Sequence, residues 1–361
     1  MHSLSYALVG CGRIAKRHIL AVQDNPELKL VGLVDIDSTA SQSLDDEYNL
    51  QVEHYSSIED LYTHKCPDVV AIATESGSHA YLAKYALEHF SHLIIEKPMA
   101  LSIDDCNEII ECAKRANKKV CVCHQNRFNK SMQYVAQLMS LHAFGDITHA
   151  SCALRWNRDK SYYDQAPWRG SWAHDGGCVM NQCIHILDAL LYLIDKPVKS
   201  VWAKTNNLIH PYIEGEDIAF AHITFEGDIA AHFEGSVTMY ERNLEETLAL
   251  FGSKGLCKIG GTSLNCIEEF RLQSSQKSLH EIQEITAEHP ENVYGFGHGA
   301  LYKNFIEAIQ TDTSPLIDAY AGKRAVELVL AIYQSSRTHQ EVKLPILKGA
   351  SIDMQGFEPW K

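Results

Sequence analysis

The first 124 residues alternate between short apolar runs and amphipathic stretches, and this alternation limits the fold more than any other feature of the chain. The apolar runs have the length of strands, and the stretches between them have the apolar spacing of helices. The expected strands are 6–9, 28–35, 67–73, 93–96 and 120–123, and the expected helices are 13–25, 79–90 and 103–117. Strands that alternate with such helices predict an α/β fold with a parallel, doubly wound sheet.

A glycine pattern, Gly10-x-Gly12-x-x-Ala15, lies where the first expected strand passes into the first helix. In this context Gly10 permits a tight turn, Gly12 lets the backbone approach a pyrophosphate, and Ala15 allows close packing of helix and strand. The phosphates would meet the N–H groups at the start of the helix. A glycine turn without a ligand is the alternative, but the strand-turn-helix context favours a dinucleotide site.

The second expected strand ends at Asp35, twenty residues after Ala15. A carboxylate at this place accepts hydrogen bonds from ribose hydroxyls and repels a 2′-phosphate. The residues that follow, Ile36, Asp37 and Ser38, include no arginine. We therefore expect NAD rather than NADP as the cofactor. An aspartate in a solvated turn is the alternative.

The tripeptide Glu96-Lys97-Pro98 follows the strand expected at 93–96. Ligands of open α/β sheets bind beyond the carboxyl ends of the strands. We therefore expect Lys97 to face the reactive end of the cofactor, against the alternative of an ordinary surface lysine. Pro98 is a candidate for a cis peptide bond, since such bonds are confined almost entirely to X–Pro.

After residue 124 the pattern becomes a series of strands separated by turn signals. The expected strands are 147–156, 198–204, 217–225, 229–239, 246–251 and 255–260. Turns are indicated at Glu226-Gly227-Asp228 and Gly252-Ser253-Lys254-Gly255. Helices on one face of such a sheet leave the other face to be covered, and a homodimer or homotetramer would cover it.

A helical repeat runs through residues 180–194. Its expected core positions are Met180, Ile184, Leu187, Leu191 and Ile194. Asn181 and His185 lie four residues apart in the adjacent stripe, so both can converge on one ligand. A buried, hydrogen-bonded histidine is the alternative, but Asn181 and the upstream pair Gly176-Gly177 favour a functional site.

The composition excludes several classes of protein. The chain has 32 Lys and Arg against 46 Asp and Glu, a formal net charge of −14, so we expect no nucleic-acid binding. No apolar run approaches the roughly 18 residues of a membrane span, and a secretory signal is not expected. The eleven cysteines include no C-x-x-C pair, so we expect reduced thiols in a cytoplasmic protein and no metal site.

Together these blocks resemble the Gfo/Idh/MocA oxidoreductases. The matching residues are Gly10-Cys11-Gly12-Arg13-Ile14-Ala15, Asp35, Thr74 with His79, Glu96-Lys97-Pro98 and the late helix from His298 to Ile309. The resemblance implies an NAD-binding Rossmann domain over 1–123. It also implies a C-terminal α/β domain over 124–361, with a large, mostly antiparallel open sheet that serves substrate binding and oligomerisation.

Blocks within 124–188 resemble the UDP-N-acetylglucosaminuronate 3-dehydrogenases more narrowly. They are His124-Gln125-Asn126-Arg127-Phe128-Asn129, Tyr162-Tyr163-Asp164, Trp168-Arg169-Gly170-Ser171-Trp172, Asp175-Gly176-Gly177 and Asn181-Gln182-Cys183-Ile184-His185. This resemblance implies oxidation of the C3 hydroxyl of a UDP-sugar, whose 3-keto product feeds a transamination in bacterial lipopolysaccharide or other surface-polysaccharide biosynthesis. It also implies that 2-oxoglutarate reoxidises the reduced cofactor.

The site residues follow from these motifs. The residues expected at the cofactor are Gly10, Gly12, Arg13, Ile14, Asp35, Thr74, His79, Glu96, Lys97, Gln125, Trp168 and Arg169. The residues expected at the substrate are Lys97, Arg155, Arg158, Tyr163, Arg169, Asn181 and His185. The segment 155–169 has a local net charge of +2, and arginine forks match phosphate and carboxylate oxygens. An exposed loop with ordinary charges is the alternative for this segment.

The expected catalytic residues are Lys97, His185 and Asn181. Oxidation of a secondary alcohol needs a base for the hydroxyl proton, and a neutral imidazole suits that role near neutral pH. We therefore assign the base to His185 and stabilisation of the developing alkoxide to Lys97, although the two roles can be exchanged. Asn181 stands where the wider family often has Asp, and a neutral amide would not repel an anionic substrate.

Three other functions stay open. Within the family, the substrate is UDP-N-acetylglucosamine, or it is another sugar or an inositol. Outside enzymes, the same fold serves as a ligand-sensing regulatory protein. The presence of both Lys97 and His185 favours the enzyme, because a silent binding protein has no need of either.

Overall fold

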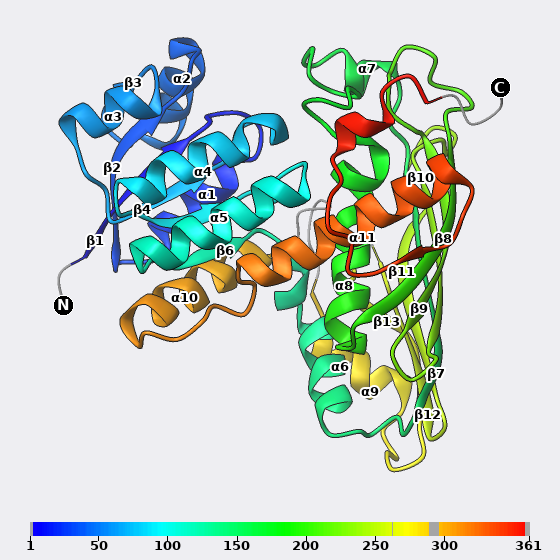
Figure 1. Ribbon diagram of the computed structural model, residues 1–361. Helices are drawn as coiled ribbons and strands as arrows, with labels where there is room; N and C mark the ends of the chain where they lie inside the picture. The colour runs from blue at the N-terminus through cyan, green and yellow to red at the C-terminus, as the bar shows by residue number, and fades with distance from the viewer. Residues whose placement is uncertain (1–2, 262, 289–295, 358–361) are drawn as a thin grey trace. The chain divides into compact units, whose positions relative to one another are not determined.

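The computed structural model describes residues 3–261, 263–288 and 296–357. It consists of two compact units (Figure 1), which are described separately. The first unit contains Met1–Cys123 and His298–Lys323, and the second contains His124–Gly297 and Arg324–Lys361. The predicted second domain, 124–361, included residues 298–323, which the structure groups with the first unit instead.

The first unit is built on a six-stranded sheet in the order β3-β2-β1-β4-β5-β6. All of its strand pairs are parallel, as predicted. The strands are β1 (Leu4–Val9), β2 (Leu28–Val34), β3 (Glu53–Tyr55), β4 (Val69–Ile72), β5 (His92–Ile95) and β6 (Val120–Val122). The helices of this unit are α1 (Ala15–Gln23), α2 (Ser38–Tyr48), α3 (Ile58–His64), α4 (His79–Glu88), α5 (Ile103–Ala116) and α10 (Gly297–Gln310), with the short turn η1 (Ser76–Ser78).

The central strands are apolar along their length because both faces of the sheet are covered. All four residues of β4 are buried, as are the last four of β1. The segment α2-β3-α3 was not predicted, because its sequence from 38 to 64 is mostly polar and shows little periodicity. Local signals do exist there: the Asp37 side chain accepts a hydrogen bond from the Thr39 amide at the start of α2.

Residues 298–323 belong to the first unit for two physical reasons. The Tyr302 hydroxyl on α10 lies 2.7 Å from the Tyr6 hydroxyl on β1, and both side chains are fully buried. Farther along, the Val122 amide donates to the Ile317 carbonyl at 3.0 Å, so this segment pairs with β6 at the edge of the sheet. Such a return of the chain over nearly 200 residues leaves no local trace in the sequence.

The second unit is built on an eight-stranded sheet in the order β13-β12-β11-β7-β10-β9-β8-β14. Only the β7–β10 pair is parallel, so the predicted mostly antiparallel sheet is confirmed. The strands are β7 (Ile147–Arg155), β8 (Val198–Asn206), β9 (Ile218–Phe225), β10 (Ala230–Ser236), β11 (Glu245–Gly252), β12 (Gly255–Gly260), β13 (Cys266–Leu272) and β14 (Val342–Lys343). β13 and β14 were not predicted.

Helices cover one face of this second sheet (Figure 1). The helices and short turns of the second unit are η2 (Gln125–Phe128), α6 (Lys130–Ser140), α7 (Lys160–Tyr163), η3 (Val179–Cys183), α8 (Ile184–Ile194), α9 (Leu279–Thr286), η4 (Ser351–Met354) and α11 (Ala319–Thr338), which belongs to this unit from Arg324 onward. α8 packs against β7 and β11. The five core positions predicted for 180–194 are all buried. The other face exposes Trp202 and Phe220.

All eleven cysteines are free, and all except Cys66 and Cys266 are buried. Their burial agrees with the predicted reduced, apolar role. Within the described ranges, every helix is too short or too polar to cross a lipid bilayer.

His92, at the start of β5, gives the first unit a pH-dependent stability. Its Nδ1 accepts a hydrogen bond from the Lys119 amide at 3.0 Å, which requires a neutral ring. Burial, aided by the charges of Lys118 and Lys119, lowers the pKa of His92 to about 4. Below pH ~6.5 the His92 ring therefore binds a proton in the unfolded chain, whereas in the folded chain it stays neutral until the pH approaches 4. This contribution to stability is present above pH ~6.5 and is lost as the pH falls towards 4.

We expect thermal unfolding of the wild type to shift to lower temperature between pH 7 and pH 5 more steeply than that of His92→Gln. Glutamine can still accept a hydrogen bond from the Lys119 amide, but it does not titrate. Circular dichroism melts at pH 7, 6 and 5 measure the two slopes. Parallel slopes would contradict the assignment.

Candidate active site

The glycine turn after β1 has the geometry of a phosphate-binding loop. Gly10 has a φ of +96°, and a Cβ at this position would lie 2.6 Å from the Ala73 backbone, so the fold itself requires glycine there. A Cβ at Gly12 would meet nothing within 4 Å. Packing therefore does not require glycine at position 12, but the close approach of a ligand would.

The start of α1 is open to an anion. The Ile14 side chain makes no capping hydrogen bond at the start of the helix, and the first turn contains no acidic residue. The first turn of α1 therefore supplies no carboxylate to neutralise its own N–H groups and the positive end of the helix dipole. This is the environment in which helix N-termini bind pyrophosphate.

Asp35 lies beside the glycine turn. One of its oxygens accepts a hydrogen bond from the Cys11 amide at 2.7 Å, and the other accepts from the Asp37 amide at 2.9 Å. Burial, together with the Asp35 charge, raises the pKa of the Cys11 thiol to about 12, so this thiol stays neutral. The carboxylate is thus held in place after β2, where it can accept ribose hydroxyls. The turn, the helix start and Asp35 together fit NAD.

Alanine substitutions at the two glycines should affect different properties, namely stability at Gly10 and NAD affinity at Gly12. Gly10→Ala should lower the free energy of unfolding by roughly 3 kcal/mol, because of its backbone conformation and the clash with Ala73. Gly12→Ala should melt at the wild-type temperature but bind NAD at least about tenfold more weakly. Thermal melts and NADH fluorescence titrations measure both. Equal NAD affinity of Gly12→Ala and wild type would contradict the ligand-approach argument.

His79 connects the loops that follow β4 and β5. Its Nδ1 lies 2.8 Å from the Pro98 carbonyl oxygen and its Nε2 lies 3.3 Å from that of Thr74. The ring is buried, and burial lowers the pKa of His79 despite these two carbonyls. The Lys97–Pro98 peptide is cis, as the sequence suggested. His79 therefore holds the segment that carries Lys97, and its ring reaches backbone carbonyls on both sides.

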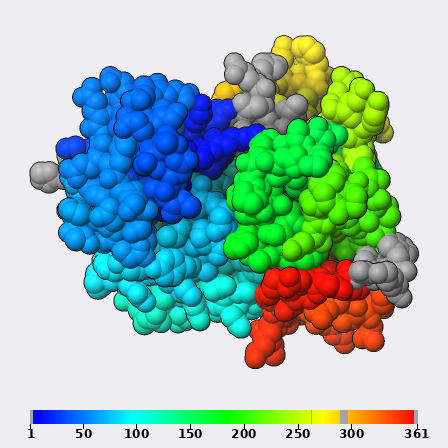
Figure 2. All heavy atoms as spheres, turned by 90° about the horizontal axis from the view of Figure 1, so that it is seen from above, coloured from blue at the N-terminus to red at the C-terminus, as the bar shows by residue number. Residues whose placement is uncertain are grey.

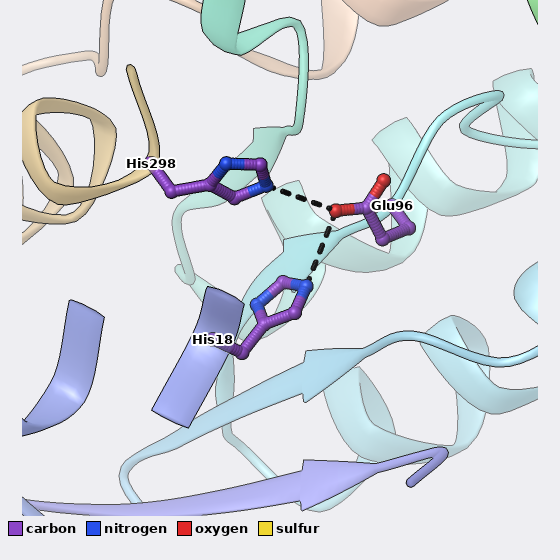
Figure 3. A group of neighbouring side chains, drawn as sticks. All are labelled: His18, Glu96 and His298. Atoms are coloured by element: carbon purple, nitrogen blue, oxygen red, sulfur yellow. Dashed lines mark hydrogen bonds and ion pairs between the residues drawn. The ribbon is translucent and has the colours of Figure 1, made fainter. Parts of the chain in front are cut away.

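Glu96 is turned towards two imidazoles of the first unit. Its Oε1 lies 3.2 Å from His18 Nε2 and 3.5 Å from His298 Nε2 (Figure 3). Its Oε2 accepts the backbone amide of Lys97 at 3.3 Å. Burial opposes ionisation, but the two histidines outweigh it and hold the pKa of Glu96 well below its usual range. Glu96 was predicted to contact the cofactor, and the structure shows a buried anion next to Lys97.

In the second unit, Asn181 lies on a π-helical turn, η3, that leads into α8. The sequence predicted a continuous α-helix here, and a π turn inserts an extra residue that changes the spacing of Asn181 and His185. The Asn181 amide donates to the Asp175 carboxylate, whose other oxygen accepts the Gly170 amide at 2.7 Å. A buried carboxylate thus lies beside Asn181, although position 181 itself carries an amide.

His185 is half-buried, whereas residues 178–184 and 186–191 are fully buried. Its ring meets the His124 ring edge-on, with centroids 5.9 Å apart. One turn further along α8, Asp188 accepts two hydrogen bonds from Arg127, at 2.8 and 2.6 Å. Gln125 is buried in η2, next to His124. His185 keeps some exposure on a helix whose other residues, Tyr192 aside, are buried, and this supports a functional role over a purely structural one.

Arg158 and Arg169 lie against Tyr162, which was not among the predicted site residues. The guanidinium carbons of Arg158 and Arg169 lie 5.1 and 4.4 Å from the centre of the Tyr162 ring. The Tyr162 hydroxyl accepts from Arg169 Nη1 at 2.6 Å and from Gln182 Nε2 at 2.9 Å. Arg169 also stacks on Trp168, at 4.5 Å. The segment around α7 lies at the surface of the second unit (green in Figure 2).

The structure does not bring Arg155 and Tyr163 into this group. Arg155 alternates along β7 with buried Leu154, so it lies on the face of the sheet opposite α8. There it pairs with Glu234 and Glu245 on the neighbouring strands. Tyr163 is buried, and burial raises its pKa, so it is an interior phenol. Of the two adjacent tyrosines, Tyr162 is the one that contacts the arginines.

A glycine-lined start to a helix, a carboxylate placed for ribose and a lysine after the fifth strand define a dinucleotide-dependent oxidoreductase. Two family models match the chain. The model described as "Oxidoreductase family, NAD-binding Rossmann fold" matches residues 4–124, and the GFO/IDH/MocA C-terminal domain matches residues 132–258. The chain belongs to the Gfo/Idh/MocA family and is an NAD-dependent oxidoreductase that acts on CH–OH groups.

The chain is also similar to individual proteins of known structure or sequence. The WlbA dehydrogenase of Bordetella pertussis, crystallised with NADH and UDP-GlcNAcA, is 32% identical, with a TM-score of 0.89 and coverage of 96% of this chain and 99% of that one. The corresponding complex from Chromobacterium violaceum is 31% identical, with a TM-score of 0.87, and 96% and 97% are covered. The uncharacterized oxidoreductase YrbE of Bacillus subtilis is 27% identical, over 69% of this chain and 71% of its own.

Proposed function

We propose that the protein oxidises the C3 hydroxyl of a UDP-sugar, UDP-N-acetylglucosaminuronate, with NAD. The observation that carries the proposal is the similarity to two dehydrogenases crystallised with NADH and UDP-GlcNAcA, which extends over 96% of the chain in each case. Identity above 30% over both domains supports a shared substrate class more strongly than the fold alone does.

The group around Tyr162 supports an anionic nucleotide-sugar as substrate. Arg158 and Arg169 supply planar donors that match pyrophosphate and carboxylate oxygens. The rings of Trp168 and Tyr162 offer faces on which a base can stack. In a chain of net charge −14, this local pair of arginines is suited to hold a substrate that carries several negative charges.

The proposed chemistry divides between two residues. His185 takes the proton of the C3 hydroxyl, and Lys97 stabilises the negative charge that develops on the oxygen. Asn181, held by Asp175, orients the sugar next to His185. The bound NAD supplies the acceptor for the hydrogen that leaves C3 as hydride. The product is a 3-keto sugar, the substrate type that an aminotransferase converts to a 3-amino sugar.

Substrate tests separate this proposal from its alternatives. Purified protein is incubated with NAD and either UDP-N-acetylglucosaminuronate, UDP-N-acetylglucosamine, free N-acetylglucosamine or myo-inositol, and the products are identified by mass spectrometry. Loss of two mass units from the uronate alone is expected. Turnover of only the free sugars or inositol would refute the nucleotide-sugar assignment, and turnover of none would favour a binding protein.

We further propose that 2-oxoglutarate is the terminal acceptor and is reduced to 2-hydroxyglutarate. In that case sugar oxidation without 2-oxoglutarate should stop after about one turnover per subunit, because the reduced cofactor is not released. Adding 2-oxoglutarate should restore multiple turnovers and yield 2-hydroxyglutarate. Free NADH that accumulates over many turnovers without 2-oxoglutarate would contradict this part of the proposal.

A homodimer or homotetramer would cover the exposed face of the second sheet. Trp202 is 52% exposed and Phe220 is 48% exposed, and such apolar side chains on one face favour association. We expect light scattering to give a mass of two or four times 40.5 kDa, and Trp202→Glu to shift that mass towards the monomer. A monomeric wild type would refute the proposed assembly.

A further inference from the structure

The π turn η3, which carries Asn181, begins against two buried side chains from distant segments. They are Glu216, just before β9, and Tyr333 on α11. Glu216 Oε1 accepts the Val179 amide at 2.7 Å. The Tyr333 hydroxyl accepts the Met180 amide at 3.1 Å. These two N–H groups lie at the beginning of the helical segment, where a helix has no acceptors of its own, so both side chains hold the start of η3 in place.

The same two side chains also pack against the glycine turn that leads into η3. The Tyr333 hydroxyl oxygen lies 2.7 Å from the Gly176 carbonyl oxygen. Gly177 has a φ of +90°, and a Cβ there would collide with Glu216 Oε2 and would lie 2.7 Å from the Tyr333 hydroxyl. Glu216 Oε2 is therefore directed at the backbone of this turn, which has no room for a side chain.

The contacts of the Tyr333 hydroxyl require a proton on Glu216. A hydroxyl has one proton, and the Gly176 carbonyl can only accept. The Tyr333 proton is therefore directed to Gly176, while the Met180 amide supplies its own. The third contact of the hydroxyl, 2.7 Å from Glu216 Oε1, then needs a proton that the carboxyl group must supply. All three contacts carry a proton only while Glu216 is a neutral acid.

The surroundings of Glu216 favour this neutral form. Burial raises the pKa of Glu216 to about 8, and the charge of Asp175 adds to this. The other ionisable groups around it are Tyr333 on α11, the Cys178 thiol before η3, the Tyr163 phenol on α7, and Asp217, which His210 Nδ1 approaches at 3.1 Å. The carboxyl therefore stays protonated at neutral pH and ionises in mildly alkaline solution.

We infer that Glu216 and Tyr333 are positioning residues for the sugar site, and that they act only while Glu216 is neutral. They hold the turn and the start of η3, which carries Asn181 and leads into α8 with His185. When Glu216 ionises, its carboxylate takes the Tyr333 proton, and the Gly176 carbonyl faces a hydroxyl oxygen that has no proton to give. The turn then moves away, and Asn181 moves with it. The effect on turnover rests on the proposed function.

Hydrogen exchange of the substrate-free full chain tests this directly. Mass spectrometry follows the peptide that spans residues 176–183 at pH 7 and pH 9, and each rate is divided by that of the unfolded peptide at the same pH. Protection in the wild type should fall about tenfold, the excess of ionised over neutral acid one pH unit above the midpoint. In Glu216→Gln it should stay constant, because the amide keeps its protons at both pH values. Glu226→Gln, exposed between β9 and β10, should behave like the wild type.

Turnover gives a second readout, with whichever sugar the wild type oxidises. The ratio of kcat/KM at pH 9 to that at pH 7 should be about tenfold larger in Glu216→Gln than in the wild type. NADH affinity at pH 7 should be equal in both proteins. A pair of residues that only stabilised the fold would leave this ratio unchanged. If no sugar is oxidised, the proposed function fails, and the exchange experiment still decides whether the turn depends on Glu216.

Tyr333→Phe replaces Glu216→Gln if the latter does not fold. It removes the hydroxyl but keeps the ring against Trp172, where the two ring centroids are 5.2 Å apart. The 176–183 peptide should then exchange faster already at pH 7 and should lose no further protection at pH 9. Equal protection of the wild type at both pH values, or the same loss of protection in Glu216→Gln as in the wild type, would overturn the inference.

Discussion

His185→Ala should reduce kcat by about 10²- to 10⁴-fold and leave NAD binding near its wild-type value. On the proposed mechanism alanine removes the group that accepts the hydroxyl proton, so the expected loss is large. NADH fluorescence titration gives the affinity, and sugar oxidation gives the rate. His222→Ala, on the uncovered face of the second sheet, changes the same residue type at an exposed position and should keep full activity.

Lys97→Ala should reduce kcat by a similar factor for a different reason. In the proposed mechanism it removes the group that stabilises the negative charge on the C3 oxygen, and it leaves the base in place. Lys97→Arg restores a cation and should recover part of the rate, whereas an arginine could not act as a base. No recovery in Lys97→Arg, combined with an acid limb that disappears in Lys97→Ala, would show that Lys97 accepts the proton. Wild-type rates in both alanine variants would refute the site assignment altogether.

Glu246→Leu should raise the free energy of unfolding by roughly 3 kcal/mol at pH 8. Glu246 lies on β11 opposite Leu154, and it is 1% exposed. Neither of its carboxylate oxygens has a hydrogen-bond partner in the described part of the chain. Burial therefore raises the pKa of Glu246 to about 8. Leucine fills the same space without a polar group that loses its hydration.

The stabilisation by Glu246→Leu should increase as the pH rises. The unfolded chain releases the Glu246 proton near pH ~4.3, whereas the folded chain keeps it until about pH 8. The stability of the wild type therefore falls as the pH rises through this interval, and the difference between Glu246→Leu and the wild type grows with it. Denaturant titrations at pH 5 and pH 8 measure the difference at both ends.

Glu216 provides a matched control. Burial also raises its pKa to about 8, but its Oε1 lies 2.7 Å from both the Val179 amide nitrogen and the Tyr333 hydroxyl oxygen. Glu216→Leu leaves the buried Val179 amide without its acceptor, while the Tyr333 hydroxyl keeps only the Gly176 carbonyl at 2.7 Å, and the change should destabilise the protein. If Glu246→Leu also destabilises the protein, the Glu246 carboxylate is not the unpaired buried group inferred from its position.

The sequence was sufficient for those elements whose signal is local. Residues 6–9 of β1, the whole of β4 and residues 93–95 of β5 are continuous apolar runs. The order of strand, glycine turn and helix around Gly10 identifies a dinucleotide fold without any knowledge of tertiary contacts. The segment from α2 to α3 was missed because its polar sequence carries only capping signals, such as Asp37. The π turn that contains Asn181 was missed because residues 178–184 are all buried, so the sequence pattern there does not reveal an inserted residue.

Side-chain contacts between residues far apart in the sequence were a second limit on what could be predicted. Arg155 looked like an anion-binding residue by its neighbours, but its partners Glu234 and Glu245 lie 79 and 90 positions away. Glu96 likewise meets His18 across 78 positions and His298 across 202. The alternation of Arg155 with buried Leu154 along a strand was the available signal for the face on which Arg155 lies.

Transfer of hydride from C3 can be followed with UDP-N-acetylglucosaminuronate that carries deuterium at C3. We expect the deuterium to leave the sugar during oxidation and to be recovered in the reduced cofactor or, when 2-oxoglutarate is present, at C2 of 2-hydroxyglutarate, with a slower turnover than that of the unlabelled sugar. Recovery of an oxidised sugar that keeps the deuterium would contradict it, because the hydride would then have left another carbon.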